Sequence, residues 1–339
     1  MVRCALLVAL ISVGSSAALT TLLASALQAM STSPGRATES VAPTDDARRL
    51  DAIEFDIKDG RYIAEVPILR DYLREHSSSW RAHYDLGYAL FRARGGNMSL
   101  AEVIRESIQE LSRSLVLNVN NADAHKILAL DLVMIQRDSL AETEFKEAER
   151  LNPASAEIHY FLGRHYMGQS NYIPAKRELE LAIQLDPSYM KAYENLGITM
   201  DMMGDGTAAL TNYLKAVELD ERQSVISELP YLDLSKFYHD QNQIDLSESF
   251  ALKALQINPR SEQAYFELAR NYRERAQWAK AKEMLMKAIA INPRAAQYYF
   301  LLAQTYNRLG EKEKSKEAVS NYLKYRNLPD PHSESPEPQ

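Results

Sequence analysis

Cysteine is almost absent from this chain, with 1 in 339 residues. The single cysteine, Cys4, lies in the N-terminal segment, so the rest of the chain has no thiol. Disulfides, CxxC zinc sites and cysteine nucleophiles are therefore excluded outside that segment. A chain of this length can bury enough apolar surface to fold without disulfides, so their absence is compatible with an exported protein.

Positive charge is not in excess either. The chain carries 46 Asp and Glu against 39 Lys and Arg, which gives a net charge of -7. A nucleic-acid surface needs a basic stripe that displaces counterions from phosphates, and no such stripe is visible. The composition therefore predicts no nucleic-acid partner.

Motifs that carry catalysis or cofactor binding are also missing. The sequence has no H-E-x-x-H, C-x-x-C or G-x-S-x-G motif. It has no glycine-rich phosphate loop, because Gly204-Asp205-Gly206 has the features of a turn between helices. We therefore expect no catalytic residue, no metal site and no cofactor, and we expect that the chain is not an enzyme.

A long apolar run occurs at the N-terminus. Residues 5–29 are mostly apolar or small, follow Arg3 and contain an A-x-A site at Ala24-Ser25-Ala26. This pattern is typical of a secretory signal peptide over residues 1–29. The alternative is an uncleaved membrane anchor within residues 4–29, because the stretch is long enough to span a bilayer. With Arg3 on the cytoplasmic side, either form predicts an exported chain, periplasmic or extracellular.

Two polar segments flank the remaining sequence. Residues 30–45 are rich in Ser, Thr, Pro and Ala and predict a flexible linker. Residues 328–339 are rich in Pro, Ser and Glu and predict a disordered tail. Between them the pattern is helical, without a strand signal. Asn-Pro or Asp-Pro dipeptides end one helix before the next begins. They occur at Asn152-Pro153, Asp186-Pro187, Asn258-Pro259 and Asn292-Pro293.

What the chain does have is a period of 34 residues. Small residues recur at this spacing in three series: Ala129, Gly163 and Gly197; Ala141, Ala175 and Ala209; Ala148, Ala182 and Ala216. A fixed period of this length marks a stacked array of repeats. Such arrays grow by adding units and usually build an extended binding surface rather than a catalytic pocket.

The repeat resembles the tetratricopeptide pattern, which is W-x2-L-G-x2-Y followed by A-x3-F and P. Residues 156–189, for example, have Leu162-Gly163, Tyr166, Ala175 and Pro187 at the positions of the pattern. The resemblance implies an all-α, right-handed superhelical solenoid of stacked antiparallel helix pairs. It covers residues 46–327 with about eight pairs, and the best units are 122–155, 156–189, 190–223, 228–261 and 262–295.

Two interruptions break the period. A slip of four residues, 224–227, separates two of the best units. Eight extra residues lie near Gly95-Gly96, in the unit that starts at Trp80. Each insertion should lengthen a helix or a loop.

Histidines occupy a repeated position. His83, His125 and His159 stand at the fourth residue of their units, where the family has tryptophan. Other units of this chain have tyrosine there, at Tyr193, Tyr231, Tyr265 and Tyr299. We expect the histidines to be packing residues, because no metal-binding spacing accompanies them.

The resemblance also implies where a ligand binds. In tetratricopeptide proteins the first helix of each unit lines the concave surface, mainly through repeat positions 2, 5, 9, 12 and 13. Aromatic and arginine side chains dominate interface hot spots, although some of these rings could instead pack between repeats. The predicted groove residues are Tyr84, Tyr88, Arg92, Tyr160, Arg164, Phe266, Arg270, Arg273, Phe300 and Arg308.

One ligand type of the family is not expected. The carboxylate clamp, which grips a peptide C-terminus, needs Lys and Asn at positions 5 and 9 of adjacent units. This chain has Lys126 with Leu130 and then Tyr160 with Arg164. It therefore departs from the clamp, and a chaperone-tail ligand is not predicted.

These features predict an extracytoplasmic scaffold that binds a peptide or a partner protein in the concave groove. The alternative is a structural subunit of an envelope assembly, secretion or polysaccharide-export complex. The sequence leaves the partner and the oligomeric state open.

Overall fold

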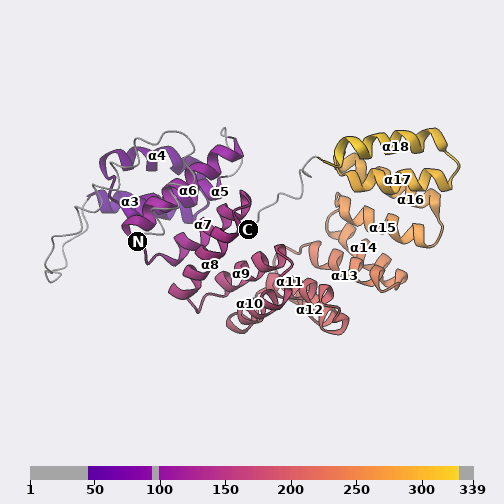
Figure 1. Ribbon diagram of the computed structural model, residues 1–339, viewed down its shortest axis with the longest axis horizontal. Coiled ribbons are helices and arrows are strands. Elements are labelled where there is room, and N and C mark those ends of the chain that lie inside the picture. The colour runs from indigo at the N-terminus through magenta and orange to yellow at the C-terminus, as the bar shows by residue number, and fades with distance from the viewer. Residues whose placement is uncertain (1–44, 94–98, 328–339) are drawn as a thin grey trace. The chain divides into compact units, whose positions relative to one another are not determined.

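The computed structural model describes residues 45–93 and 99–327 (Figure 1). The predicted signal peptide or anchor lies outside the described residues, as do the predicted tail, Gly95-Gly96 and nearly all of the predicted linker. Within the described residues, no helix has both the length and the apolar composition that crossing a membrane requires.

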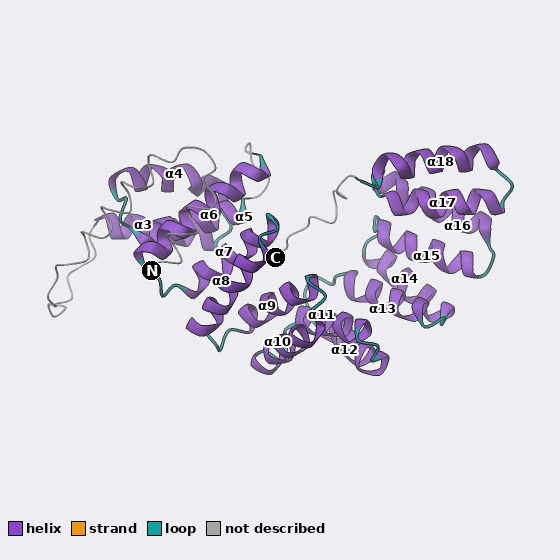
Figure 2. Ribbon diagram, viewed as in Figure 1, coloured by secondary structure: helices purple, strands orange, loops and turns teal. Residues whose placement is uncertain are grey.

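Every regular element in the described residues is a helix (Figure 2). This confirms the predicted all-α fold class. From the N-terminal side, the helices are α3 Asp45–Lys58, α4 Tyr62–Glu75, α5 Trp80–Arg92, α6 Leu100–Leu117, α7 Ala122–Met134, α8 Asp138–Leu151, α9 Ala156–Gly168 and α10 Tyr172–Leu185. They are followed by α11 Met190–Met202, α12 Gly206–Asp220, α13 Leu229–Asp240, α14 Ile244–Ile257, α15 Glu262–Glu274, α16 Trp278–Ile291, α17 Ala296–Arg308 and α18 Lys312–Tyr325.

The helices pack in sequence order. Helix α7 packs on α8, and the pairs α11–α12, α13–α14, α15–α16 and α17–α18 repeat this arrangement. The second helix of a pair also contacts the first helix of the next pair, as α14 does with α15. Because only residues 275–277 separate α15 from α16, the two helices of that pair run antiparallel. No pair can bury its apolar face alone, so the array depends on stacking.

The chain divides into two compact units. Unit 1 ends at His165 and unit 2 begins at Tyr166, so the boundary falls inside α9. One core cluster of unit 1 includes Leu69, Ala82 and Ala89, all with an exposed fraction of 0%. A core cluster of unit 2 is centred on Ala269, Leu285 and Ala288, which are also fully buried.

Small residues at the helix crossings explain the 34-residue period. A Cβ added at Gly197 in α11 would lie 2.7 Å from ring atoms of Tyr213 in α12. A Cβ at Gly87 in α5 would lie 2.6 Å from the Leu111 side chain in α6. Real side chains do not approach so closely, so the glycines allow each pair of helices to meet.

The turn inside each pair other than α5–α6 has one residue in the left-handed region. It falls at repeat position 15 and is glycine at Gly60, Gly204 and Gly310, with φ between 79° and 86°. Other units place a residue with a side chain there, at Gln136, Ser170, Asn242 and Ala276. A left-handed residue just after a helix ends it and starts the turn.

The four-residue slip lengthens a loop. Helix α12 continues to Asp220, and the chain then runs through residues 221–228 before α13. The equivalent connection between α14 and α15 is only residues 258–261. The Asp220 carboxylate accepts the backbone N–H of Ser227 at 3.1 Å, which fixes the longer loop against the end of α12.

Candidate binding surface

The ten predicted groove residues all lie on first helices of their pairs. We call the residues at positions 2, 5, 9, 12 and 13 of these helices the first-helix surface of a unit. Unit 1 contributes Tyr84, Tyr88, Arg92, Tyr160 and Arg164, and unit 2 contributes Phe266, Arg270, Arg273, Phe300 and Arg308. The structure places their side chains in several different environments.

Helix α5 carries a stack of aromatic rings that ends at an arginine. The rings of Tyr84 and Tyr88 are stacked with centroids 6.1 Å apart, and Tyr62 meets Tyr88 edge-on at 6.1 Å. The Arg92 guanidinium lies 4.7 Å from the Tyr62 ring centroid and 5.9 Å from that of Tyr88. Burial raises the pKa of Tyr84, so its phenol stays neutral at physiological pH. Tyr62 was not among the predicted groove residues, because it starts α4, the second helix of its pair, and the prediction used first helices only.

A cavity lies beside this arginine. Its volume is about 520 Å³, and it is lined by residues 60–64 of the α3–α4 turn and the start of α4, with Arg92 and Ala93. Ile63 on its wall is 63% exposed. The cavity therefore combines an aromatic ring, an aliphatic side chain and two arginines.

On α7 and α9, the next first helices of unit 1, the side chains at position 5 are buried. Tyr160 is only 4% exposed and packs against Phe161, with ring centroids 5.1 Å apart. Exposed Arg164 lies over the Tyr160 ring at 5.7 Å. Buried Lys126 bonds to Asp123 at 2.9 Å and to Glu157 at 2.7 Å. The lysine at this clamp position therefore already has two carboxylate partners within unit 1.

The three predicted groove arginines of unit 2 differ in their partners. Arg270 pairs with Asp240 at 2.8 Å and Glu267 at 2.9 Å, so its charge is compensated. Arg273 donates to the neutral amide oxygen of Gln304 at 2.6 Å, and its buried Nε has no hydrogen-bond partner. Burial lowers the pKa of Arg273, with Arg308 and Arg270 acting in the same direction and Glu274 opposing them. Arg308 is exposed and lies 5.6 Å from the centroid of the Trp278 ring.

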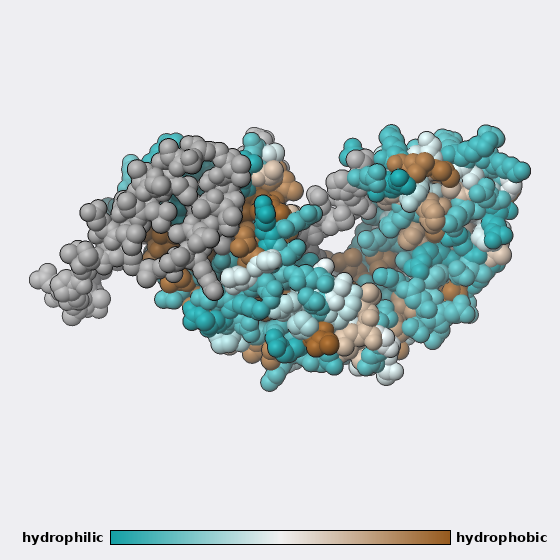
Figure 3. Space-filling view, viewed as in Figure 1, coloured by the Kyte–Doolittle hydropathy of each residue, from teal (hydrophilic) through white to brown (hydrophobic). Residues whose placement is uncertain are grey.

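The two predicted phenylalanines also differ. Phe266 is half-buried and packs against Tyr298 at 5.0 Å. Phe300 packs on Tyr322 at 5.4 Å yet remains 47% exposed. On the face drawn in Figure 3, hydrophilic side chains predominate and hydrophobic ones gather in small groups. Among the predicted aromatic residues, Phe300 has the most exposed side chain.

Two of the histidines at repeat position 4, His83 and His125, make hydrogen bonds through both ring nitrogens. His83 Nδ1 lies 2.5 Å from Glu110 and Nε2 lies 3.0 Å from the Ser77 carbonyl. His125 repeats this with Glu144 at 2.6 Å and the Val119 carbonyl at 3.0 Å. In other units a tyrosine hydroxyl donates to the equivalent carbonyl six residues earlier, as Tyr265 does to Pro259 at 3.2 Å and Tyr299 to Pro293 at 3.1 Å.

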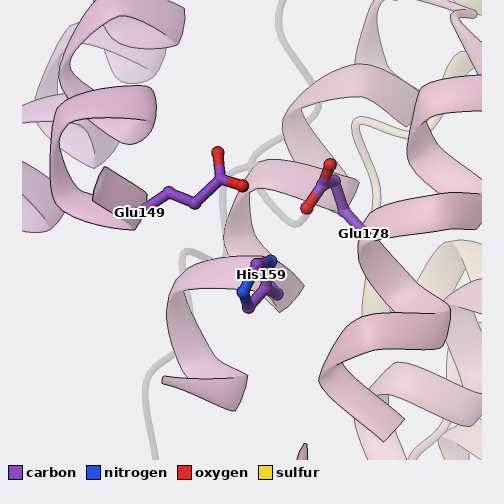
Figure 4. A group of neighbouring side chains, drawn as sticks. All are labelled: Glu149, His159 and Glu178. Atoms are coloured by element: carbon purple, nitrogen blue, oxygen red, sulfur yellow. The ribbon is translucent and has the colours of Figure 1, made fainter. Parts of the chain in front are cut away.

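These buried contacts give the histidines a structural role. Figure 4 shows His159 and Glu149 of unit 1 with Glu178 of unit 2. Carboxylates and imidazole are suitable metal ligands, but Glu178 belongs to the other unit. Within either unit taken alone, the described residues contain no group of three His, Cys, Asp or Glu side chains that could hold a metal ion.

Buried carboxyl groups recur at repeat position 6. Burial, together with the nearby charge of Glu54, raises the pKa of Asp85 to about 8. Burial and Glu194 likewise raise the pKa of Asp233 well above its ordinary value. Oδ2 of each aspartate is buried without a hydrogen-bond partner. These groups were missed from the sequence, because an aspartate on a helix ordinarily faces solvent.

Comparisons with known proteins agree with this arrangement. Residues 230–261 and 266–325 match two family models that are both described as tetratricopeptide repeat. The structure of the APC/C hetero-tetramer Cut9–Hcn1 is similar, with a TM-score of 0.62 and 16% identity. That match covers 75% of this chain and 48% of the other, so this chain spans about half the length of that protein.

Two bacterial structures are also similar. A tetratricopeptide repeat protein from Parabacteroides merdae ATCC 43184 matches with a TM-score of 0.60 and 14% identity, over 77% of this chain and 99% of that one. Pseudomonas aeruginosa pilF matches with a TM-score of 0.54 and 18% identity, over 66% of this chain and 97% of that one. At these identities the likeness shows the fold. Stacked repeat arrays build extended concave binding surfaces, and residues 230–261 and 266–325 of this array match the tetratricopeptide repeat.

Proposed function

We propose that this protein is an extracytoplasmic scaffold that binds a peptide or a segment of a partner protein on the first-helix surface of its units. The observation that carries the proposal is that aromatic and arginine side chains on this surface are exposed to solvent or line a cavity. Phe300 is 47% exposed, Arg308 is exposed, and Arg92 lines a cavity. Side chains of these types supply most of the binding energy at protein interfaces.

The extracytoplasmic part of the proposal is supported by the N-terminal apolar segment. Residues 5–29 with Arg3 have the composition of a signal peptide or an anchor. Protease treatment of intact and permeabilised cells tests the compartment. Degradation in cells whose cytoplasmic membrane is intact supports export, and protection until that membrane is broken contradicts it.

The binding part is tested with a triple variant, Arg92→Ala, Phe300→Ala and Arg308→Ala, expressed in the native cell. Chemical crosslinking followed by mass spectrometry identifies the partner of the unaltered protein. We expect the triple variant to keep its helical circular dichroism and to lose that partner.

A matched triple variant on second helices serves as the control. Arg105→Ala in α6 with Lys316→Ala and Val319→Ala in α18 alters exposed side chains of similar type. This control should keep the partner. Equal capture by both folded variants contradicts the proposal. It instead favours a structural subunit that assembles through other faces, which size exclusion of a large envelope complex would reveal.

A further inference from the structure

The cavity between α4 and α5 carries a positive charge that no acidic side chain in the described part of the chain compensates. Among the described residues, its lining contains Arg61 and Arg92 and no aspartate or glutamate. Arg61 is paired with Asp56 at 2.7 Å and Asp59 at 3.4 Å. Arg92 has no carboxylate partner among the described residues. Of the two arginines in the described lining, Arg92 is therefore the one whose charge is unpaired.

Two other arginines of unit 1, Arg70 and Arg81, have carboxylate partners where Arg92 has none among the described residues. Arg70 pairs with Glu106 at 2.6 Å, and Arg81 pairs with Glu54 at 2.6 Å and Asp51 at 2.8 Å. Arg92 instead contacts Tyr62 and Tyr88. Its position is fixed by cation–π contacts with the Tyr62 and Tyr88 rings, which hold the guanidinium without neutralising it.

The hydrogen-bonding capacity of Arg92 is also incompletely used. Nη1 donates to the Tyr88 hydroxyl at 3.3 Å. Nε and Nη2 have no partner within the described part of the chain, and neither atom is buried. These two nitrogens form one edge of the planar guanidinium, with two parallel N–H groups. That edge matches the two oxygens of a carboxylate, which accept both hydrogen bonds at once.

We propose that this arginine–tyrosine cavity binds a carboxylate group of the partner, held by the Nε and Nη2 edge of Arg92. The proposal rests on the proposed function and narrows it, because it assigns an acidic ligand to one place on unit 1. The aliphatic part of the ligand packs against Ile63 and the Tyr62 ring at the cavity wall. The carboxylate can belong to an acidic side chain or to a peptide C-terminus.

Isothermal titration calorimetry of the full chain at low ionic strength tests the proposal with three probes. The first is a Gly/Glu peptide blocked at both ends, the second is a Gly/Gln peptide with a free C-terminal carboxylate, and the third is inorganic phosphate. We expect one of the two peptides to bind. Binding of the first assigns a side-chain carboxylate, and binding of the second assigns a chain terminus.

Four variants show whether the carboxylate binds at Arg92. Arg92→Gln removes the charge and the two-donor edge, and should weaken peptide binding at least about tenfold, as expected for a charge-assisted bidentate contact. Arg92→Lys keeps the charge without the two-donor edge, so its affinity for the peptide should lie between those of Arg92→Gln and the unaltered protein. Arg105→Gln removes an exposed arginine of α6 and should bind like the unaltered protein. Ala64→Glu puts a carboxylate on the cavity wall, leaves both tyrosine contacts in place and should compete with the peptide.

Several outcomes would overturn the inference. They are the absence of binding by either peptide, equal weakening by Arg105→Gln, unchanged binding by Ala64→Glu, and phosphate binding more tightly than both peptides. Ala64→Gln, which adds a side chain of the same size without charge, controls for crowding of the cavity. Crosslinking of Arg92→Gln in the cell separates this inference from the proposed function. A partner still captured by that variant leaves the scaffold function intact and removes only the carboxylate site.

Discussion

Nδ1 of His125 lies 2.6 Å from Oε2 of Glu144, and both side chains are buried within one helix pair. Nε2 of the same ring lies 3.0 Å from a carbonyl oxygen, which can only accept, so Nε2 carries a proton. A second proton must then lie between Nδ1 and the carboxylate. The pair is therefore a neutral unit made of two groups that could not be buried separately.

Breaking this pair should destabilise the protein, and replacing both partners together should not. His125→Tyr leaves Glu144 buried without its partner, and we expect a loss of about 3–5 kcal/mol in the free energy of unfolding. The double variant His125→Tyr with Glu144→Met recreates the combination of Tyr265 and Met284 in the unit 262–295. It should recover most of the loss. Urea denaturation followed by circular dichroism of both single variants and the double variant measures the coupling, and additive effects would contradict it.

The raised pKa of Asp85 predicts a pH-dependent stability. Its pKa is about 8 in the folded protein and about 3.9 in an unfolded chain. The folded state therefore binds more protons between about pH 4 and pH 8, so the free energy of unfolding falls as pH rises through that window. Asp85→Asn removes this term and should become progressively more stable than the unaltered protein as pH rises. Denaturation midpoints across the window test this, with exposed Asp71→Asn as the control. An advantage that stays constant with pH would contradict it.

The helix crossing at Gly197 should not tolerate a side chain. Gly197→Ala puts a methyl group 2.7 Å from the Tyr213 ring, which must move, and we expect a loss of about 1–3 kcal/mol in stability. Gly168→Ala is a matched control, because no atom lies within 4 Å of the added Cβ. Thermal melts should show a lower midpoint for the first variant and no decrease for the second.

The left-handed turn positions predict a stabilising change. Ala276 has a φ of 54°, a conformation that disfavours an L side chain. Ala276→Gly should raise the free energy of unfolding by about 0.5–1 kcal/mol, after the greater freedom of glycine in the unfolded chain is subtracted. Gly204→Ala is the reverse change at a φ of 82°, and should lower it. The two variants moving in the same direction would contradict this account.

The fold could be predicted from the sequence because close packing restricts the crossing residues so strongly. Gly197 and Ala209 recur at the 34-residue spacing since larger side chains would separate the helices. The His–Glu pairs also had a sequence signal that we did not use. Units with His83 or His125 have Glu110 or Glu144 at repeat position 23, whereas units with tyrosine have Asn212, Phe250, Met284 or Ala318 there.

The candidate site could be predicted only as a set of positions. Arginines occupy the first-helix surface as expected, but the sequence does not reveal which of them are already paired. Arg270 is compensated by Asp240, which lies 30 residues earlier on another helix, and Arg92 meets Tyr62 at the same separation. Long side chains choose among several such neighbours by small differences in packing, and the repeat pattern does not encode these differences.

The polar contacts of the array fall into two kinds, with different consequences for rearranging it. The His125–Glu144 pair joins two helices of one repeat, so a duplicated or transplanted repeat would bring the whole pair with it. Ser247 instead bonds to Asn271 of the next repeat, at 2.8 Å and 3.0 Å, and Ser107 bonds to Asp131 in the same way. A repeat moved away from its successor would leave that serine and its partner unmatched in the interior. A repeat whose polar contacts are all of the first kind can be moved without losing them. A repeat with contacts of the second kind keeps them only beside its native neighbour.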